Sequence, residues 1–201
     1  MVNLQKGQKV NLVKESAGLT QVRVGLGWDE AQPQQHGLRA LFAAKPADID
    51  CDASVILCGE NGKLIPSKDF CIYFGNLRHP SGAVVHQGDN LTGGGEGDDE
   101  QITVDLPRIP ANVQKLVFVV NIYDAAPRHQ HFGMIRNAFI RLVDTRNERE
   151  ICRYNLTEDY SGMTGLVVGE LNRNGGQWEF DAIGRGVAQA SRLDALINLY
   201  R

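Results

Sequence analysis

The sequence predicts an all-β protein, an antiparallel sandwich or barrel followed by a C-terminal amphipathic helix. Three observations support this fold class. Short apolar or alternating runs recur along the 201 residues, with turn-forming residues between them. The long amphipathic crossovers that parallel βαβ units require are missing at the places where they would be needed. Apolar residues adopt helical spacing only in the last segment, 187–201.

The first half of the chain contains alternating runs and one buried run. Lys9–Val13 and Gln21–Leu26 alternate apolar and polar residues, as strands with one solvent-facing side do. Val55–Cys58 is continuously apolar, which predicts a buried strand. Asn61-Gly62 follows and predicts a hairpin turn, because this pair accepts positive φ. Further strands are expected at Phe70–Phe74, Ala83–His86 and Gln101–Leu106.

The second half continues the pattern. Lys115–Tyr123 is the most apolar run, so we expect it to be a central strand. Asn174-Gly175-Gly176 is expected to turn the last strand pair. The other strands are expected at Ala138–Val143, Ile151–Leu156, Thr164–Leu171 and Gln177–Ile183.

The C-terminal segment 187–201 is predicted to be an amphipathic helix. Its residues Leu193, Leu196, Ile197 and Tyr200 fall on one helical face. We expect this face to pack on its own domain, with packing on a partner chain as the alternative. Because no segment reads as a linker, we expect a single domain over residues 1–201, with the strand core extending to about residue 186.

Composition excludes several classes of protein. The formal net charge is −3 and no dense basic patch occurs, which argues against non-specific nucleic-acid binding. We find neither a signal peptide nor an apolar run that could span a bilayer, so a cytoplasmic protein is expected. The four cysteines form no CxxC pair, and we expect buried free thiols rather than a zinc site.

Two acidic segments stand out, the first at residues 48–54. In extended chain Asp48, Asp50 and Asp52 point the same way, roughly 7 Å apart. Three like charges so placed repel by about 1 kcal/mol or less per pair when solvated, and by more when partly buried. A solvated face tolerates this repulsion, whereas a bound divalent ion would turn it into attraction.

The second acidic segment lies within residues 86–102, HQGDNLTGGGEGDDEQI. Calcium prefers six to eight oxygen donors in a flexible geometry, and glycines allow backbone carbonyls to turn inward. A solvated loop and a magnesium site are the alternatives. Because two acidic segments occur in one small domain, we favour calcium. The side chains that could supply oxygen are those of Asp89, Asn90, Glu96, Asp98, Asp99 and Glu100.

No nucleophile, base and orienting residue are matched in the sequence, so we predict no catalytic residues and no organic cofactor. His129 and His131, with Arg128, are interpreted as a polar loop. The first acidic segment is not an EF-hand, because Ala53 and Gly59 occupy the positions that need glycine and a bidentate glutamate. A metal-dependent hydrolase using the acidic residues is the alternative to a non-enzymatic binding module.

The chain resembles the TerD family of tellurium-resistance and bacterial stress proteins, from Met1 to about Gly186. The glycine-acid segment is the most distinctive part of this similarity. The resembling motifs are Val24–Asp29, Asp48–Ser54, Gly88–Gly93, Glu96–Glu100, Phe118–Asp124, Asn137–Arg141 and Gly169–Leu171.

The resemblance implies a sandwich of two antiparallel sheets that binds calcium, with two ions. It implies ligand roles for Asp50, Asp52, Asp89, Asn90, Asp98, Asp99 and Glu100, and also for Asp48 and Glu96. Asp29 and Asp124 fall in family-like motifs and could equally hold loops by hydrogen bonds. The implied function is a non-enzymatic, calcium-dependent scaffold in tellurite and stress resistance. Its implied partners are other Ter-type proteins, including membrane-associated ones, which could place it peripherally at the inner membrane.

Overall fold

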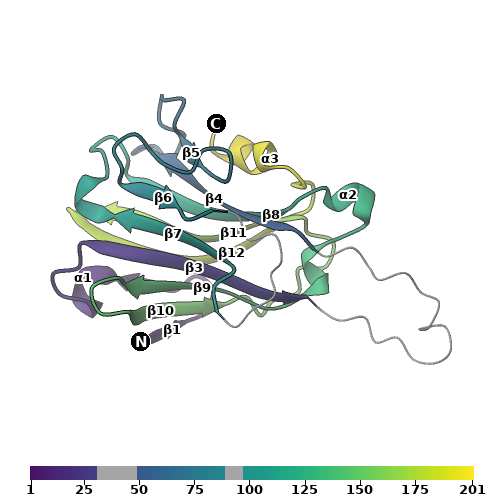
Figure 1. Ribbon diagram of the computed structural model, residues 1–201, viewed down its shortest axis with the longest axis horizontal. Coiled ribbons are helices and arrows are strands. Elements are labelled where there is room, and N and C mark those ends of the chain that lie inside the picture. Colours follow the sequence, from purple (N-terminus) through teal and green to yellow (C-terminus); the bar gives the residue numbers. More distant parts are fainter. Residues whose placement is uncertain (31–48, 89–96) are drawn as a thin grey trace.

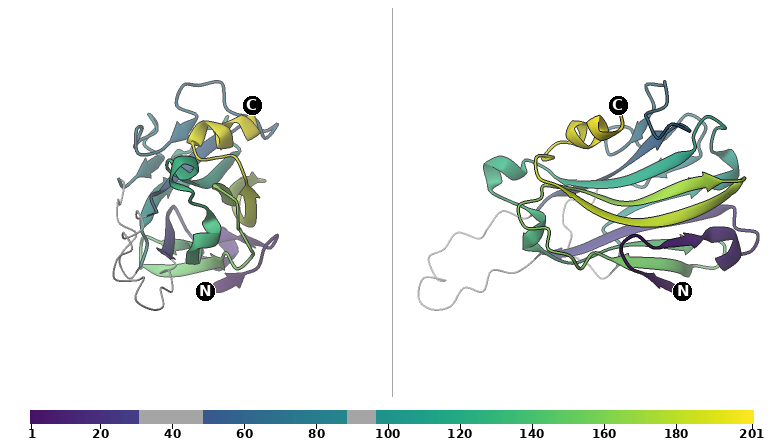
Figure 2. Two further views of the ribbon diagram at one scale, coloured as in Figure 1. Left: turned by 90° about the vertical axis from the view of Figure 1, so that its right-hand side faces the viewer. Right: turned by 180° about the vertical axis from the view of Figure 1, so that it is seen from behind.

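Two sheets face each other in the computed structural model, which describes residues 1–30, 49–88 and 97–201 (Figures 1 and 2). Within these residues each sheet has six strands. Sheet A has the spatial order β1 (Val2–Leu4), β10 (Arg149–Asn155), β9 (Ile135–Asp144), β3 (Gln21–Glu30), β7 (Glu100–Asp105) and β6 (Val84–His86). Sheet B has the order β2 (Lys9–Asn11), β12 (Gln177–Val187), β11 (Gly165–Asn174), β8 (Lys115–Ile122), β4 (Cys51–Cys58) and β5 (Cys71–Ile72).

The predicted antiparallel sandwich is confirmed. Among the described strands, every pair is antiparallel except β1 with β10. Strand β8 lies between β11 and β4, in the interior of sheet B, as its apolar sequence predicted. Short helical turns connect the strands: α1 (Leu12–Glu15), η2 (Leu106–Arg108), α2 (Ala125–Arg128) and η3 (Phe132–Met134). No helix in the described part of the chain is long and apolar enough to cross a bilayer.

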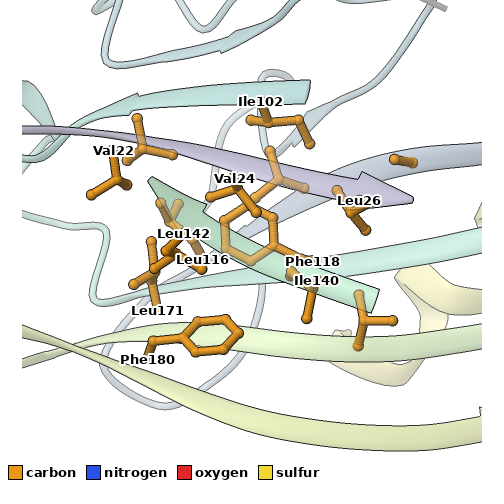
Figure 3. Packing of buried hydrophobic residues seen from close by; sticks show 14 of the residues in the cluster. Val22, Val24, Leu26, Ile102, Leu116, Phe118, Ile140, Leu142, Leu171 and Phe180 are labelled. Atoms are coloured by element: carbon orange, nitrogen blue, oxygen red, sulfur yellow. The ribbon is translucent and has the colours of Figure 1, made fainter. Parts of the chain in front are cut away.

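Alternation along each strand fills the space between the sheets. On β3, Val22, Val24 and Leu26 are buried in the core, which sends Arg23 and Gly25 to the outer face of sheet A. Side chains of β3, β7 and β9 meet those of β8, β11 and β12 in the core (Figure 3). Burial of such apolar surface stabilises the fold by roughly 25 cal/mol per Å².

Two predicted turns are confirmed, and two predicted strands are too long. The strand expected at Phe70–Phe74 is reduced to β5, Cys71–Ile72. Gly175 and Gly176 join β11 to β12 with φ of 56° and 83°. Gly62 turns with φ of 72°, and the chain after it forms an isolated bridge with β4 rather than a full hairpin strand. The strand expected at Lys9–Val13 stops at Asn11, because the Asn11 side chain accepts hydrogen bonds from the next backbone N–H groups and starts α1.

The C-terminal helix is present but shorter than predicted. It consists of α3 (Leu193–Ile197) and η4 (Asn198–Tyr200), whereas β12 continues to Val187. The Thr164 hydroxyl donates to the Ala188 carbonyl (3.0 Å) and accepts from the Ala190 N–H (2.8 Å), so these backbone groups are bound outside a helix. The predicted apolar face is confirmed, and it covers the outer face of sheet B. Figure 1 shows α3 on that side of the sandwich.

Both carboxylate oxygens of Asp144 accept hydrogen bonds within the fold. Arg146 donates to Oδ1 from Nε (3.0 Å) and to Oδ2 from Nη2 (2.7 Å), and Ser16 Oγ donates to Oδ2 at 2.6 Å. The Arg146 guanidinium holds the pKa of Asp144 well below its usual range. These bonds tie the end of β9 to the segment that follows α1.

Asp144→Asn is expected to lower Tm by about 5 °C at pH 7, because the ion pair and part of the hydrogen bonding are lost. A depressed pKa stabilises the fold above the ordinary aspartate pKa, and this contribution disappears as the pH falls below about 4. The deficit of the variant should therefore shrink between pH 4 and pH 2 in thermal melts. Asp105→Asn, on β7, is the control and should change Tm little. An Asp144→Asn deficit that is the same at pH 7 and pH 2 would contradict this explanation.

Candidate metal centre

The predicted ligands divide between residues that the structure describes and residues that it does not. The described ones are Asp50, Asp52, Asp98, Asp99 and Glu100. Asp48, Asp89, Asn90 and Glu96 lie outside the described residues, so their ligand roles stay predictions.

Asp98 lies over the outer face of sheet A, and its side chain is fully buried. Arg141 Nε donates to Asp98 Oδ1 at 2.7 Å. Gln101 Nε2 donates to Oδ2 at 3.1 Å. The carboxylate rests against Gly25, where a Cβ atom would lie 2.2 Å away from it. Asp98 is therefore engaged within the protein on both of its oxygens.

Asp99 lies beside the end of β3. Its backbone N–H donates to the Leu26 carbonyl (2.8 Å), and its Oδ2 accepts from the Trp28 N–H (2.7 Å). Burial raises the pKa of Asp99, the Trp28 hydrogen bond opposes this, and the negative charges of Asp29 and Asp98 add to the rise. The ionised carboxylate is thus held near like charge in partly dry surroundings.

Glu100 points between the sheets. It shares the inward side of β7 with core residues, and its Oε2 lies 3.2 Å from His86 Nε2. His86 Nε2 also lies 3.1 Å from the Ala53 carbonyl of β4, and His86 Nδ1 accepts from the Gly88 N–H at 3.1 Å. Because Nδ1 accepts, we assign the ring proton to Nε2. This contact joins β6 and β7 of sheet A to β4 of sheet B.

Three consecutive acidic residues thus have three separate environments. Asp98 faces outward on sheet A, Asp99 lies beside the end of β3, and Glu100 faces the core. Residues 98 and 100 would share one face of a regular strand, so their opposite directions show that the chain bends before β7 begins at Glu100.

Asp52 lies on the opposite side of the molecule from Asp98. It alternates with core residues of β4 and therefore faces the outer side of sheet B, where Asn121 Nδ2 donates to its Oδ2 at 3.3 Å. Ser54 Oγ and Asn121 Oδ1, on the same face, are buried and have no hydrogen-bond partner within the described part of the protein. Asp50 precedes β4, and its carbonyl accepts from the Tyr123 N–H at 2.7 Å.

A single ion cannot contact both Asp52 and Asp98. Packed sheets lie about 10 Å apart, whereas calcium binds its oxygen ligands at about 2.3–2.6 Å. The two carboxylates occupy the two outer faces, with the core between them. The predicted ligands therefore belong to at least two separate places.

Asp29 and Asp99 form a pair of neighbouring acidic side chains. The two carboxylates are close enough for Asp29 to raise the pKa of Asp99. Asn137, which adopts φ of 52°, donates from Nδ2 to Asp29 Oδ2 at 2.7 Å and fixes this side chain. The sequence contained Asp29 only as part of a motif, because its nearness to Asp99 depends on the pairing of distant segments. Asp124, the other motif residue, caps α2 with φ of 48° and makes no side-chain capping bond.

The donor set fits a hard cation only in part. Within residues 1–30, 49–88 and 97–201, no group of three His, Cys, Asp or Glu residues is arranged to hold a metal ion. Asp29 and Asp99 supply carboxylate oxygens, the ligand type that calcium prefers. Further oxygens would have to complete the coordination sphere.

The cysteines are placed for packing. All four are free and buried, as predicted. Burial raises the pKa of Cys58 to about 11 and those of Cys71 and Cys152 to about 12. Thiolate is the reactive form of cysteine, so these three thiols are poor nucleophiles.

A cavity of about 280 Å³ lies away from the acidic segments, between the start of β9 and the loop after β10. The hydroxyls of Tyr154 and Tyr160 both donate to Glu158 Oε2, at 3.1 and 2.7 Å, beside this cavity. The sequence holds no signal for this cavity, because the residues that line it, within 132–138 and 156–160 and at Leu166, meet only in the fold.

A solved structure and a family model define the class of protein to which this chain belongs. A crystal structure of a protein of unknown function has a TM-score of 0.66 and 22% identity, covering 92% of this chain and 99% of its own, which shows a shared β-sandwich fold. The TerD domain family model matches residues 1–200. The chain therefore belongs to the TerD family, and the C-terminal helix lies inside the matched domain rather than after it.

Two named bacterial proteins are similar to this chain over most of its length. Stress response protein SCP2 of Bacillus subtilis strain 168 is 49% identical over 199 residues, covering 99% of this chain and 98% of that protein. Tellurium resistance protein TerD of Serratia marcescens is 44% identical over 187 residues, covering 93% and 91%. The family is thus one of tellurium-resistance and stress-response proteins.

Asp99→Asn is expected to raise Tm by about 3 °C in the presence of a chelator. The amide oxygen can still accept from the Trp28 N–H, while the repulsion from neighbouring acids and the burial of a charge are removed. Thermal melts at pH 7 measure the change. Asp98→Asn is the matched control and should lower Tm, since it weakens the pairing with Arg141. A lower Tm for Asp99→Asn would contradict the proposed effects of charge repulsion and burial at Asp99.

The thiols are expected to resist modification in the folded protein. At pH 8, Ellman's reagent should react with few thiols in the native chain and with all four after unfolding in guanidinium. Rapid modification of any thiol in the native protein would contradict this expectation.

Proposed function

We propose that this TerD-family protein binds calcium and acts as a non-enzymatic, calcium-dependent interaction module in tellurite and stress resistance. The observation that carries the proposal is the pair Asp29 and Asp99. Within the described residues neither carboxylate makes an ion pair. The Trp28 N–H donates to Asp99 and the Asn137 side-chain amide donates to Asp29, whose charge raises the pKa of Asp99.

Calcium would relieve the repulsion between these carboxylates. A divalent ion with carboxylate and carbonyl ligands favours the ionised form of Asp99, which burial and the neighbouring acids disfavour. The predicted Asp89, Asn90 and Glu96 would extend the oxygen set at this end. Asp52 lies on the outer face of sheet B, whereas Asp99 is bound to β3 of sheet A, and this supports two ions rather than one. Ser54 and Asn121 would be neutral oxygen donors beside Asp52.

The proposed role of the ion is to stiffen one end of the sandwich. Segments 49–52 and 97–100 flank β4 and β7, which belong to different sheets. Ions bound at these segments would order a surface against which a partner docks. We propose other Ter-type proteins, including membrane-associated ones, as the partners of a cytoplasmic protein.

Calcium is expected to raise Tm by about 5–10 °C relative to chelator, when its concentration is about a hundred times the Kd. Differential scanning fluorimetry measures the shift, and calorimetry counts the ions. Asp99→Asn and Asp52→Asn should each remove part of the ion count, while Asp105→Asn serves as the control. An unchanged Tm between chelator and millimolar calcium would overturn the proposal.

The hydrolase alternative predicts metal-dependent turnover of phosphoester or glycoside substrates. A panel of such substrates should show no turnover that depends on Asp50. Turnover that disappears in Asp50→Ala would replace the interaction module with an enzyme.

A further inference from the structure

We infer that Asp98 is an anchor rather than a cation ligand, and that Arg141 and Gly25 are positioning residues that hold Asp99 in place. This inference rests on the proposed function for its calcium readout. Its structural part, the attachment of residues 97–99 to β3, stands on contacts within the described chain.

The first support is the environment of Asp98. Its side chain is fully buried although its main chain is partly exposed, and both oxygens accept hydrogen bonds, from Arg141 and Gln101. The ion pair with Arg141 neutralises the carboxylate. A divalent cation approaching it would meet a guanidinium at hydrogen-bond distance, and that positive charge would repel it.

The second support is a flat surface on β3. A Cβ at Gly25 would lie 2.2 Å from the Asp98 carboxylate, and one at Gly27 would lie 2.7 Å from the Gly97 carbonyl. Both glycines fall on the outer face of sheet A. They leave room for residues 97 and 98 to lie directly on the strand, which any larger side chain would prevent.

The third support is that Arg141 is itself held firmly. Its Nη1 donates to Glu150 Oε2 (3.2 Å), and Glu150 Oε1 accepts from Arg153 Nε (3.1 Å). The Arg153 guanidinium stacks 4.0 Å from the centre of the Phe139 ring, and this ring also packs on Gly27. The guanidinium that holds Asp98 therefore belongs to a network across β9 and β10.

The consequence is the placement of the next residue. With Asp98 fixed, the Asp99 N–H reaches the Leu26 carbonyl and the Asp99 carboxylate reaches the Trp28 N–H. Releasing Asp98 would free Asp99 to move away from Asp29. Residues that orient a metal ligand typically change metal affinity by 10–100-fold when they are mutated.

The first arm of the test measures calcium affinity by calorimetry for Asp98→Ala, Arg141→Ala and the double variant. An anchor predicts a 10–100-fold loss for each single variant and no further loss in the double variant, because both remove one contact. Arg141→Lys should recover part of the affinity, and Gly25→Ala should lose it. Arg23→Gln, which removes another ion pair on the same face, is the matched control. Loss in Asp98→Ala with normal affinity in Arg141→Ala would overturn the inference, because it would make Asp98 a ligand.

The second arm needs no metal. In chelator, amide hydrogen exchange of Asp99 and Trp28 should become at least about tenfold faster in Arg141→Ala and Asp98→Ala, and unchanged in Arg23→Gln. Unchanged protection in both anchor variants would overturn the inference. If the wild-type protein bound no calcium, the proposed function would fail, and the exchange experiment would still decide whether Asp98 and Arg141 form the anchor.

Discussion

The two-residue alternation of extended chain is the constraint on which the rest of this structure depends. On β3 it sends Val22, Val24 and Leu26 into the core and leaves Gly25 and Gly27 on the outer face. A slip of one residue would expose the apolar set and bury the polar one. The same alternation positions the candidate site. Because the apolar side chains of β3 point into the core, its glycines lie on the outer face, where residues 97 and 98 rest against them.

Most of the strands could be predicted because their signals are local. Alternating and apolar runs locate the strands, and Asn174-Gly175-Gly176 locates a turn. The misses have local or long-range causes. Asn11 stops a strand early by capping a helical turn, and Thr164 binds the backbone that the C-terminal helix would otherwise use. The capping role of Asn11 is visible in the sequence but competes with an apolar pattern. The role of Thr164 requires two segments to meet in space.

The candidate site was less predictable, because an acidic run does not reveal where each carboxylate points. Regular alternation would place Asp98 and Glu100 on one face, whereas the fold turns them to opposite faces. Only strand pairing shows which elements they meet. Pairing β3 with both β7 and β9 brings Arg141 to Asp98, and pairing β6 with β7 brings His86 to Glu100. None of these partners is adjacent in sequence to the acids.

The acidic residues of this site differ in the kind of partner that each carboxylate has. Asp98 has a guanidinium partner, and Glu100 lies against a histidine inside the sandwich. Asp99 and Asp29 instead have neutral N–H donors, which fix a carboxylate without cancelling its charge. A fold selected for stability alone would gain little from holding these charges together, since burial and the neighbouring acids disfavour the ionised form of Asp99. Retaining them side by side, while the adjacent acids are engaged, is the arrangement expected where the missing positive charge comes from outside the chain.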